Sequence, residues 1–156
     1  MTMEGYMRLA LEEAHRALEK GESPVGALVV EQGRVLSRAH NLRVANSDPT
    51  AHAEILALRE AGQRRGSWRL DGATLYVTLE PCPMCAGALV LARVKHLVYG
   101  AMDPKAGAAG TLYNIVEDSR LNHRLEVTAG VLEKECSDIL KAFFESRRNV
   151  EGCQSG

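Results

Sequence analysis

Apolar residues recur every three to four positions along the start of the chain, which predicts an amphipathic helix over residues 3–20. Gly21 follows at the position where such a helix would end. The apolar face comprises Met3, Met7, Ala10, Leu11, Ala14 and Leu18. Glu4, Glu12 and Glu13 lie among these residues, so the segment does not have the pattern of a secretory signal peptide.

A second pattern, of short apolar or alternating runs, predicts the strands of a sheet. The runs "VGALVV" (25–30) and "RVLSRA" (34–39) lie on either side of a Gln-Gly pair, which predicts a β-hairpin. Three further runs, at residues 73–79, 96–100 and 125–131, predict three more strands.

Helical patterns separate these runs. One helix is expected from about residue 51 to 61, with Asp48 or Thr50 as candidate caps, another over 84–94, and a third from about 133 to 148. Strands that alternate with helices favour an α/β fold in which helices pack against one sheet. The 156 residues fit one domain, expected over residues 1–150, and the tail "EGCQSG" (151–156) lacks a core-forming pattern and is expected to fray.

The charge balance is nearly neutral, with 19 basic and 20 acidic residues and a net charge of −1. A nucleic-acid partner is therefore neither indicated nor excluded, because a neutral total can contain a local basic patch. The longest apolar run, residues 85–92, is too short to span a bilayer, so no membrane partner is expected and a cytoplasmic location is favoured. Four cysteines, two of them in one C-x-x-C segment, suit metal or redox chemistry better than a disulfide framework.

Cys82 and Cys85, in "PCPMC" at residues 81–85, are candidate zinc ligands. Residues three apart share a helical face, so both sulfurs can reach one ion, and a helix N-terminus favours the thiolate form. The C-x-x-C alone leaves structural zinc, a redox pair and coincidence open. A structural zinc site usually takes its other two ligands from a second C-x-x-C or a His pair, and the sequence has neither at ligand spacing.

His52 and Glu54, in "HAE" at residues 52–54, supply what a catalytic zinc site still needs. His52 can be the third ligand, with Glu54 near the open coordination position as a general acid and base for a zinc-bound water. The alternative, for this segment alone, is a core or surface histidine and a carboxylate that stabilises a first helical turn. Both segments together match the H-x-E…P-C-x-x-C signature of zinc deaminases, which favours the catalytic site.

The chain resembles the bacterial tRNA-specific adenosine deaminases, within the wider cytidine and deoxycytidylate deaminase superfamily, from about residue 7 to 148. The segments that carry the resemblance are "PVGALVV", "DPTAHAEILALR", "ATLYVTLEPCPMCAGALVLARV", "GAAGTL" and "NHR". The resemblance implies a cytidine deaminase-like fold with three layers, α/β/α, around a central mixed sheet of about five strands. It also implies a homodimer in which the helices after the zinc motifs pack across the interface.

The activity implied by the resemblance is hydrolytic deamination of adenosine to inosine at the wobble position of a tRNA anticodon, with release of ammonia. One Zn²⁺ per subunit would be held by His52, Cys82 and Cys85, and Glu54 would move a proton from the zinc-bound water to the purine ring. The residues implied to contact substrate are Asn41, which would hydrogen-bond the target base, Ala53 and Glu80 through their backbones, and Asp103, Lys105, Asn122, His123, Arg147 and Arg148 on the tRNA.

Ordinary structural roles are open for several of these residues. Asn41 lies in a segment rich in turn formers, Asp103 precedes a proline, and Arg147 and Arg148 end a helix where cations are favoured in any case. Of two adjacent phenylalanines in the last helix, 143 and 144, at least one is expected in the core.

Two other functions remain open from the sequence. A zinc deaminase of a free base or nucleoside (guanine, cytosine or cytidine) would use the same metal chemistry, and only segments such as "NHR" and the Arg-Arg end of the last helix favour tRNA. A non-catalytic zinc subunit of an RNA-binding complex would not require Glu54 beside the metal.

Overall fold

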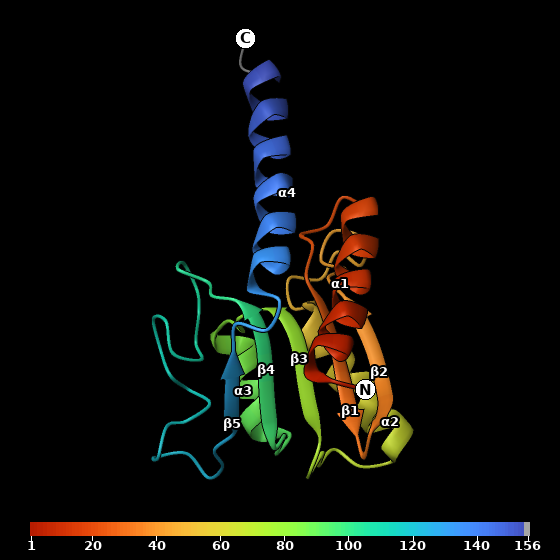
Figure 1. Cartoon of the computed structure of the whole chain (residues 1–156), viewed down its shortest axis with the longest axis vertical. Coiled ribbons are helices and arrows are strands. Elements are labelled where there is room, and N and C mark those ends of the chain that lie inside the picture. Colours follow the sequence, from red (N-terminus) through yellow and green to blue (C-terminus); the bar gives the residue numbers. More distant parts are fainter. Residues whose placement is uncertain (155–156) are drawn as a thin grey trace.

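A five-stranded mixed sheet forms the centre of the molecule in the computed structural model, which describes residues 1–154, with backbone alone for 149–154 (Figure 1). The strands are β1 (Gly26–Glu31), β2 (Arg34–His40), β3 (Thr74–Leu79), β4 (His96–Ala101) and β5 (Glu126–Ala129). Their order across the sheet is β2-β1-β3-β4-β5, with β1 antiparallel to both neighbours and β3, β4 and β5 parallel. The mixed sheet expected from the resemblance is confirmed.

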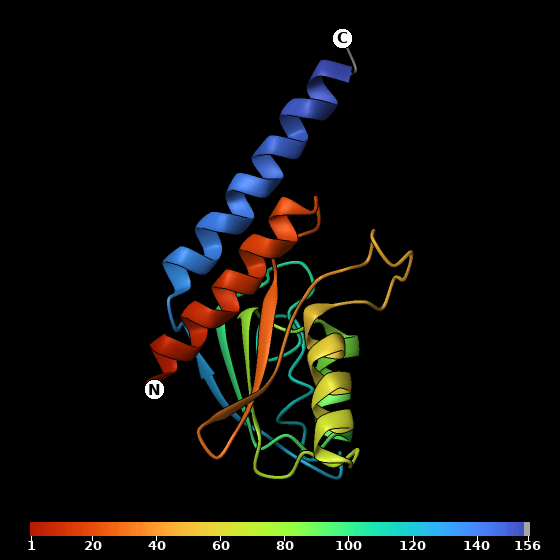
Figure 2. The same cartoon turned by 90° about the vertical axis from the view of Figure 1, so that its right-hand side faces the viewer.

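Helices cover both faces of this sheet. On one face lie α1 (Met3–Glu19) and α4 (Glu133–Gln154), and on the other lie α2 (Ala53–Arg65) and α3 (Pro83–Leu91) (Figure 2). The expected three-layer arrangement is therefore confirmed. Helix α4 continues past the expected end at 148, so residues 151–154 are helical, while 155–156 of the expected tail lie outside the described residues. The domain boundary at residue 150 stays a prediction.

The central strands are mostly apolar because helices cover both of their faces. Leu28, Val29, Leu75 and Val77 are all fully buried. Helix α1 approaches β1 so closely that a Cβ atom on Gly26 would lie 1.9 Å from the carbonyl oxygen of Ala10. A glycine at this position is what lets the helix backbone lie directly on the strand.

The strand directions bring the starts of α2 and α3 to one edge of the sheet. Because β1 is antiparallel to both β2 and β3, these two strands run the same way and end at the same edge. Helix α2 follows β2 and helix α3 follows β3, so both helices begin near that edge.

The expected caps of α2 are wrong. Asp48 accepts hydrogen bonds from Thr50 instead, and the cap position belongs to His52, which makes no side-chain capping bond.

No helix among residues 1–154 combines the length and the apolar character that crossing a bilayer requires.

Candidate active site

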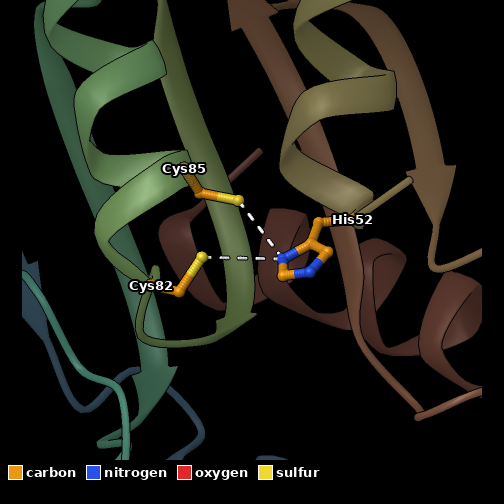
Figure 3. A group of neighbouring side chains, drawn as sticks. All are labelled: His52, Cys82 and Cys85. Carbon is orange, nitrogen blue, oxygen red and sulfur yellow. Dashed lines mark hydrogen bonds between the residues drawn. The ribbon is translucent and has the colours of Figure 1, made fainter. Parts of the chain in front are cut away.

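Three possible metal ligands meet where α2 and α3 begin. Nδ1 of His52 lies 3.6 Å from Sγ of Cys82 and 3.5 Å from Sγ of Cys85 (Figure 3). His52 and Cys82 are the cap residues of their helices, and neither side chain caps its own helix. Their side chains therefore remain free to face one another.

The donor set and its spacing fit zinc. Zinc bonds of about 2.3 Å to sulfur and about 2.0–2.1 Å to nitrogen, at tetrahedral angles, separate the two donor atoms by about 3.6 Å. The three donor atoms lie within 4.8 Å of one another, and no fourth ligand joins the group among the described residues. Three protein ligands are the pattern of a catalytic zinc site, which keeps its fourth position for water or substrate.

The cysteine pair is prepared for metal binding by its own hydrogen bond. The contact with Cys85 lowers the pKa of the Cys82 thiol to about 4, and the same contact, with burial, raises the pKa of Cys85. The contact thus favours the thiolate form of Cys82 over that of Cys85. Zinc binding would displace the proton of Cys85, because zinc takes cysteine as thiolate.

Glu54 lies in the first turn of α2, two residues after His52, and is only 4% exposed. Burial raises the pKa of its carboxyl group to about 7, because removal from water disfavours the charged form. A carboxyl group with that pKa accepts and donates a proton with little free-energy cost near neutral pH. This is the property required of a general acid and base.

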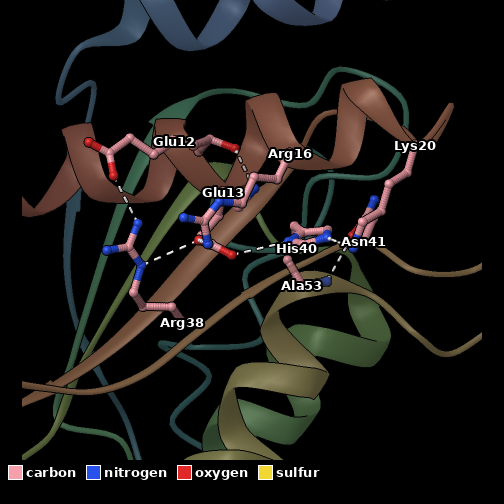
Figure 4. Close-up of polar contacts among 10 residues, drawn as sticks. Glu12, Glu13, Arg16, Lys20, Arg38, His40, Asn41 and Ala53 are labelled. Carbon is pink, nitrogen blue, oxygen red and sulfur yellow. Dashed lines mark hydrogen bonds and ion pairs between the residues drawn. The ribbon is translucent and has the colours of Figure 1, made fainter.

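These groups line a cavity of about 210 Å³ at the edge of the sheet. Of the expected substrate residues, the cavity brings Asn41, Glu80 and Asp103 together with His52, Glu54 and Cys82. The amide oxygen of Asn41 accepts the N–H of Ala53 at 2.8 Å (Figure 4). The Asn41 NH₂ group is then the part available to a substrate, and the Ala53 N–H is engaged within the protein.

Helix α1 supports the strand end that carries Asn41. The carboxylate of Glu13, 3% exposed, lies 3.0 Å from Nδ1 of His40, the last residue of β2, and 3.3 Å from Nε of Arg38 (Figure 4). The guanidinium of Arg16 lies 2.8 Å from the same carboxylate. These contacts tie α1 to the residue immediately before Asn41.

Asp103 has the structural role of a turn former, which the sequence analysis kept open beside a role in tRNA contact. Its side chain accepts the backbone N–H groups of Lys105 at 2.9 Å and Ala106 at 3.2 Å. Lys105 is exposed beside the cavity, together with Lys141, Phe144, Arg147 and Arg148 of α4. Phe143 is buried and Phe144 is half exposed, which confirms that at least one of the pair is in the core.

Asn122 and His123 lie away from this cavity. Nε2 of His123 is 2.6 Å from the carbonyl oxygen of Val94, which precedes β4 and so lies at the opposite end of the sheet from Glu80 and Cys82. Within one chain the structure does not bring these two residues to the site.

The cavity also contains residues that the sequence analysis missed. Arg43, Leu140 and Ser23 line it, and Lys141 lies in the adjoining groove. Arg43 follows Asn41 by two positions in the same loop, and this closeness to an expected substrate residue was the one feature of the sequence that could have indicated it. The others come from segments with no motif, so only the fold places them near the metal ligands.

The chain matches the MafB19-like deaminase family over residues 1–148. The tRNA-specific adenosine deaminase of Bacillus subtilis (strain 168) is 56% identical over 143 residues, covering 92% of this chain and 89% of the relative. The tRNA-specific adenosine deaminase of Haemophilus influenzae is 51% identical over 146 residues, covering 93% of this chain and 84% of the relative.

The solved structures that resemble this chain also include deaminases. A chain from a study of A-to-I editing by tRNA:A34 deaminases matches with a TM-score of 0.85 and 46% identity, covering 87% of this chain and 99% of that chain. Guanine deaminase from Nitrosomonas europaea matches with a TM-score of 0.79 and 26% identity, covering 90% and 83%. The fold and the His-Cys-Cys site thus define a deaminase of the MafB19-like type. More closely, the chain belongs to the family of tRNA-specific adenosine deaminases.

We expect the purified chain to carry about one zinc ion and the Cys82→Ala variant to lose it, because two remaining ligands hold zinc far more weakly than three. Elemental analysis after gel filtration measures this. The control is Cys136→Ala, which removes a buried cysteine that packs against Gly100 instead of His52 and should leave zinc in place. Equal zinc content in Cys82→Ala and the unaltered chain would contradict the ligand assignment.

Proposed function

We propose that the chain catalyses the zinc-dependent hydrolytic deamination of adenosine to inosine at the wobble position of tRNA anticodons, with one Zn²⁺ per subunit. The observation that carries this proposal is the position of Glu54, which is buried, has a pKa of about 7 and lines one cavity with His52 and Cys82, two of the three clustered zinc-type ligands. The choice of substrate is supported by the similarity to proteins that are named as tRNA-specific adenosine deaminases.

Each group of residues at the site has a separate role in the proposed reaction. His52, Cys82 and Cys85 would hold zinc, which supplies a Lewis acid that lowers the pKa of a bound water. Glu54 would take one proton from the water that adds to C6 of the purine and deliver it to the ring nitrogen N1. It would then take the remaining proton from the oxygen on C6 and pass it to the amino group, so that ammonia leaves, the C6 carbonyl of inosine forms and Glu54 returns to its starting form. The Asn41 NH₂ group donates to the purine and holds it over the cavity.

A basic surface beside the cavity suits the RNA backbone. The surface comprises Lys105, Lys141, Arg147 and Arg148. Phe144, half exposed at the same place, offers a flat apolar surface to an unpaired base. This local patch accounts for RNA binding by a chain whose net charge is −1. Asp103 and Lys105 on one loop and the two arginines on α4 are the proposed tRNA contacts.

A second copy of the chain is the proposed partner. An apolar groove of about 690 Å³ lies between α2 and α3, and Trp68 and Leu91 at its rim are 66% and 70% exposed. Pairing through this groove would bury both side chains. It would also offer Asn122 and His123 to the cavity of the partner, since they cannot reach their own. We place this dimer in the cytoplasm, with one domain per subunit over residues 1–150.

A deaminase of a free base is the main alternative. The similarity to guanine deaminase from Nitrosomonas europaea, at 26% identity, favours it over a non-catalytic role. A non-catalytic zinc subunit does not require a buried carboxyl group beside the metal ligands, so Glu54 weighs against it.

The substrate is tested by inosine formation on an anticodon stem-loop with adenosine at the wobble position, in parallel with a panel of free bases and nucleosides. We expect conversion of the stem-loop alone. The Glu54→Gln variant should keep its zinc and lose at least about 10²–10⁴-fold in turnover, because the amide cannot relay the proton. Conversion of a free base alone would overturn the substrate assignment, and near-full activity of Glu54→Gln would overturn the mechanism.

Replacement of Lys105 or Arg148 by alanine should weaken binding of the stem-loop and reduce its salt dependence. Each lost phosphate contact should lower the slope of log K against log[salt] by about 0.7 for a single-stranded segment. Fluorescence titration at several salt concentrations measures the slope. Arg34→Ala, at the exposed start of β2 and so at the opposite end of the sheet from the cavity, is the charge-matched control and should leave the slope unchanged. An unaltered slope in both variants would remove these residues from the interface.

The variant Leu91→Glu should shift the chain from dimer to monomer, because a charge would be buried without a partner in the apolar interface. Sedimentation velocity gives the mass. Met3→Glu, which places the same charge at a partly exposed apolar position on the other face of the sheet, should remain dimeric. A monomeric unaltered chain at micromolar concentration would exclude the proposed dimer.

A further inference from the structure

Glu80 has a fully buried carboxylate that no proposed catalytic step uses. The residue stands between the end of β3 and the cysteine motif and is 1% exposed. One carboxylate oxygen accepts the backbone N–H of Asp103 at 3.0 Å and the hydroxyl of Thr111. The other accepts the backbone N–H groups of Ala109 at 3.0 Å and Thr111 at 3.1 Å.

These four hydrogen bonds hold the loop from Asp103 to Thr111, which we call the anchored loop. The backbone adds a fifth link, from the N–H of Ala108 to the carbonyl oxygen of Pro81 at 2.8 Å. Both ends of the loop are therefore tied to the segment that carries Cys82. The loop is also the segment that presents Asp103 to the cavity and Lys105 to the basic surface.

Gly107 allows the loop to pass directly over this carboxylate. A Cβ atom at position 107 would lie 2.5 Å from Cδ of Glu80 and 2.6 Å from the carbonyl oxygen of Asp103. No side chain larger than hydrogen fits there unless the loop moves. The Glu80 carboxylate can therefore accept its four hydrogen bonds from the loop only because Gly107 lets the loop backbone lie against it.

The charge of Glu80 is balanced by neutral donors alone. It forms no ion pair within the part of the chain that the structure describes, and its partners are three amide N–H groups and one hydroxyl group. Such bonds are strong because the acceptor is ionised and buried. A glutamine of the same shape would replace one acceptor oxygen with an NH₂ group, which would face N–H donors.

We propose that Glu80 is a positioning residue for substrate binding: its carboxylate holds the anchored loop in the shape that presents Asp103 and Lys105 to the RNA. It takes no part in proton transfer. The inference rests on the proposed function, because it assigns the loop to binding of the stem-loop. It gives the side chain of Glu80 a role, while the expected contact between the Glu80 backbone and substrate stays a prediction.

The test compares Glu80→Gln, Thr111→Val and Gly107→Ala with the control Glu19→Gln, which removes an exposed carboxylate at the end of α1. We expect Glu80→Gln to raise KM for the stem-loop about 10-fold or more while kcat changes by less than about 3-fold, the pattern of lost uniform binding. Zinc content should stay at the level of the unaltered chain. Thr111→Val and Gly107→Ala should change KM in the same direction, the first by less because three bonds remain.

Amide hydrogen exchange of residues 103–111 gives a readout that does not depend on activity. Exchange should be faster in Glu80→Gln and Gly107→Ala and unchanged in Glu19→Gln. Unchanged exchange in Glu80→Gln, or a fall in kcat at constant KM, would overturn the proposal.

If Glu80→Gln does not fold, the Thr111→Val variant tests the proposal in its place. A raised KM with zinc retained would support the role of Glu80 as an anchor, and an unchanged KM would overturn it. If the unaltered chain did not convert the stem-loop, the proposed function would fail, and hydrogen exchange would still decide whether Glu80 holds the loop.

Discussion

The site depends on helices α2 and α3 beginning side by side at one edge of the sheet. Two strand ends set this arrangement: β2 and β3 run the same way because β1 lies antiparallel between them, and each is followed by one of the two helices. The cap residues of these helices are a histidine and a cysteine whose side chains leave their own helices uncapped. The positive ends of two helix dipoles also meet in this region, which favours the thiolate form of cysteine. The same pair of helix starts thus brings the three candidate ligands together and favours the form of cysteine that binds a metal.

Buried carboxylates hold the loops that surround this edge. Glu22 is 2% exposed and accepts the backbone N–H groups of Val44 and Ala45, in the loop after β2, at 3.1 and 2.8 Å. Glu80 performs the same function for the loop after β4. Loops that border a binding cavity lie at the protein surface, so they bury too little apolar surface to be ordered by packing alone. A buried ionised acceptor for their backbone N–H groups orders them with few residues.

Much of the fold was predictable because periodicity follows from burial. Helices α1 and α4 each have an apolar face of helical period, which includes Met7 and Leu140, and the inner strands are apolar runs of strand length. The meeting of His52, Cys82 and Cys85 was predictable because these residues belong to two short motifs of characteristic spacing. What could not be predicted depends on tertiary contacts: the engagement of Ala53 by Asn41, the place of His123 at the far end of the sheet, and the carboxylate of Glu80 beneath its loop. A single buried glutamate has no periodic signature, and its partners are distant in sequence.

Asn41 performs two tasks that are usually separate. Its amide oxygen takes the N–H of Ala53, the first residue of α2, and so completes the start of a helix whose own cap residue is turned toward the metal ligands. The same side chain lines the cavity. A replacement that has no acceptor oxygen would therefore change the cavity and also disturb the helix start that carries His52 and Glu54. The shape of the cavity can change most freely in the surrounding loops, where a side chain can be replaced while the helix start stays intact.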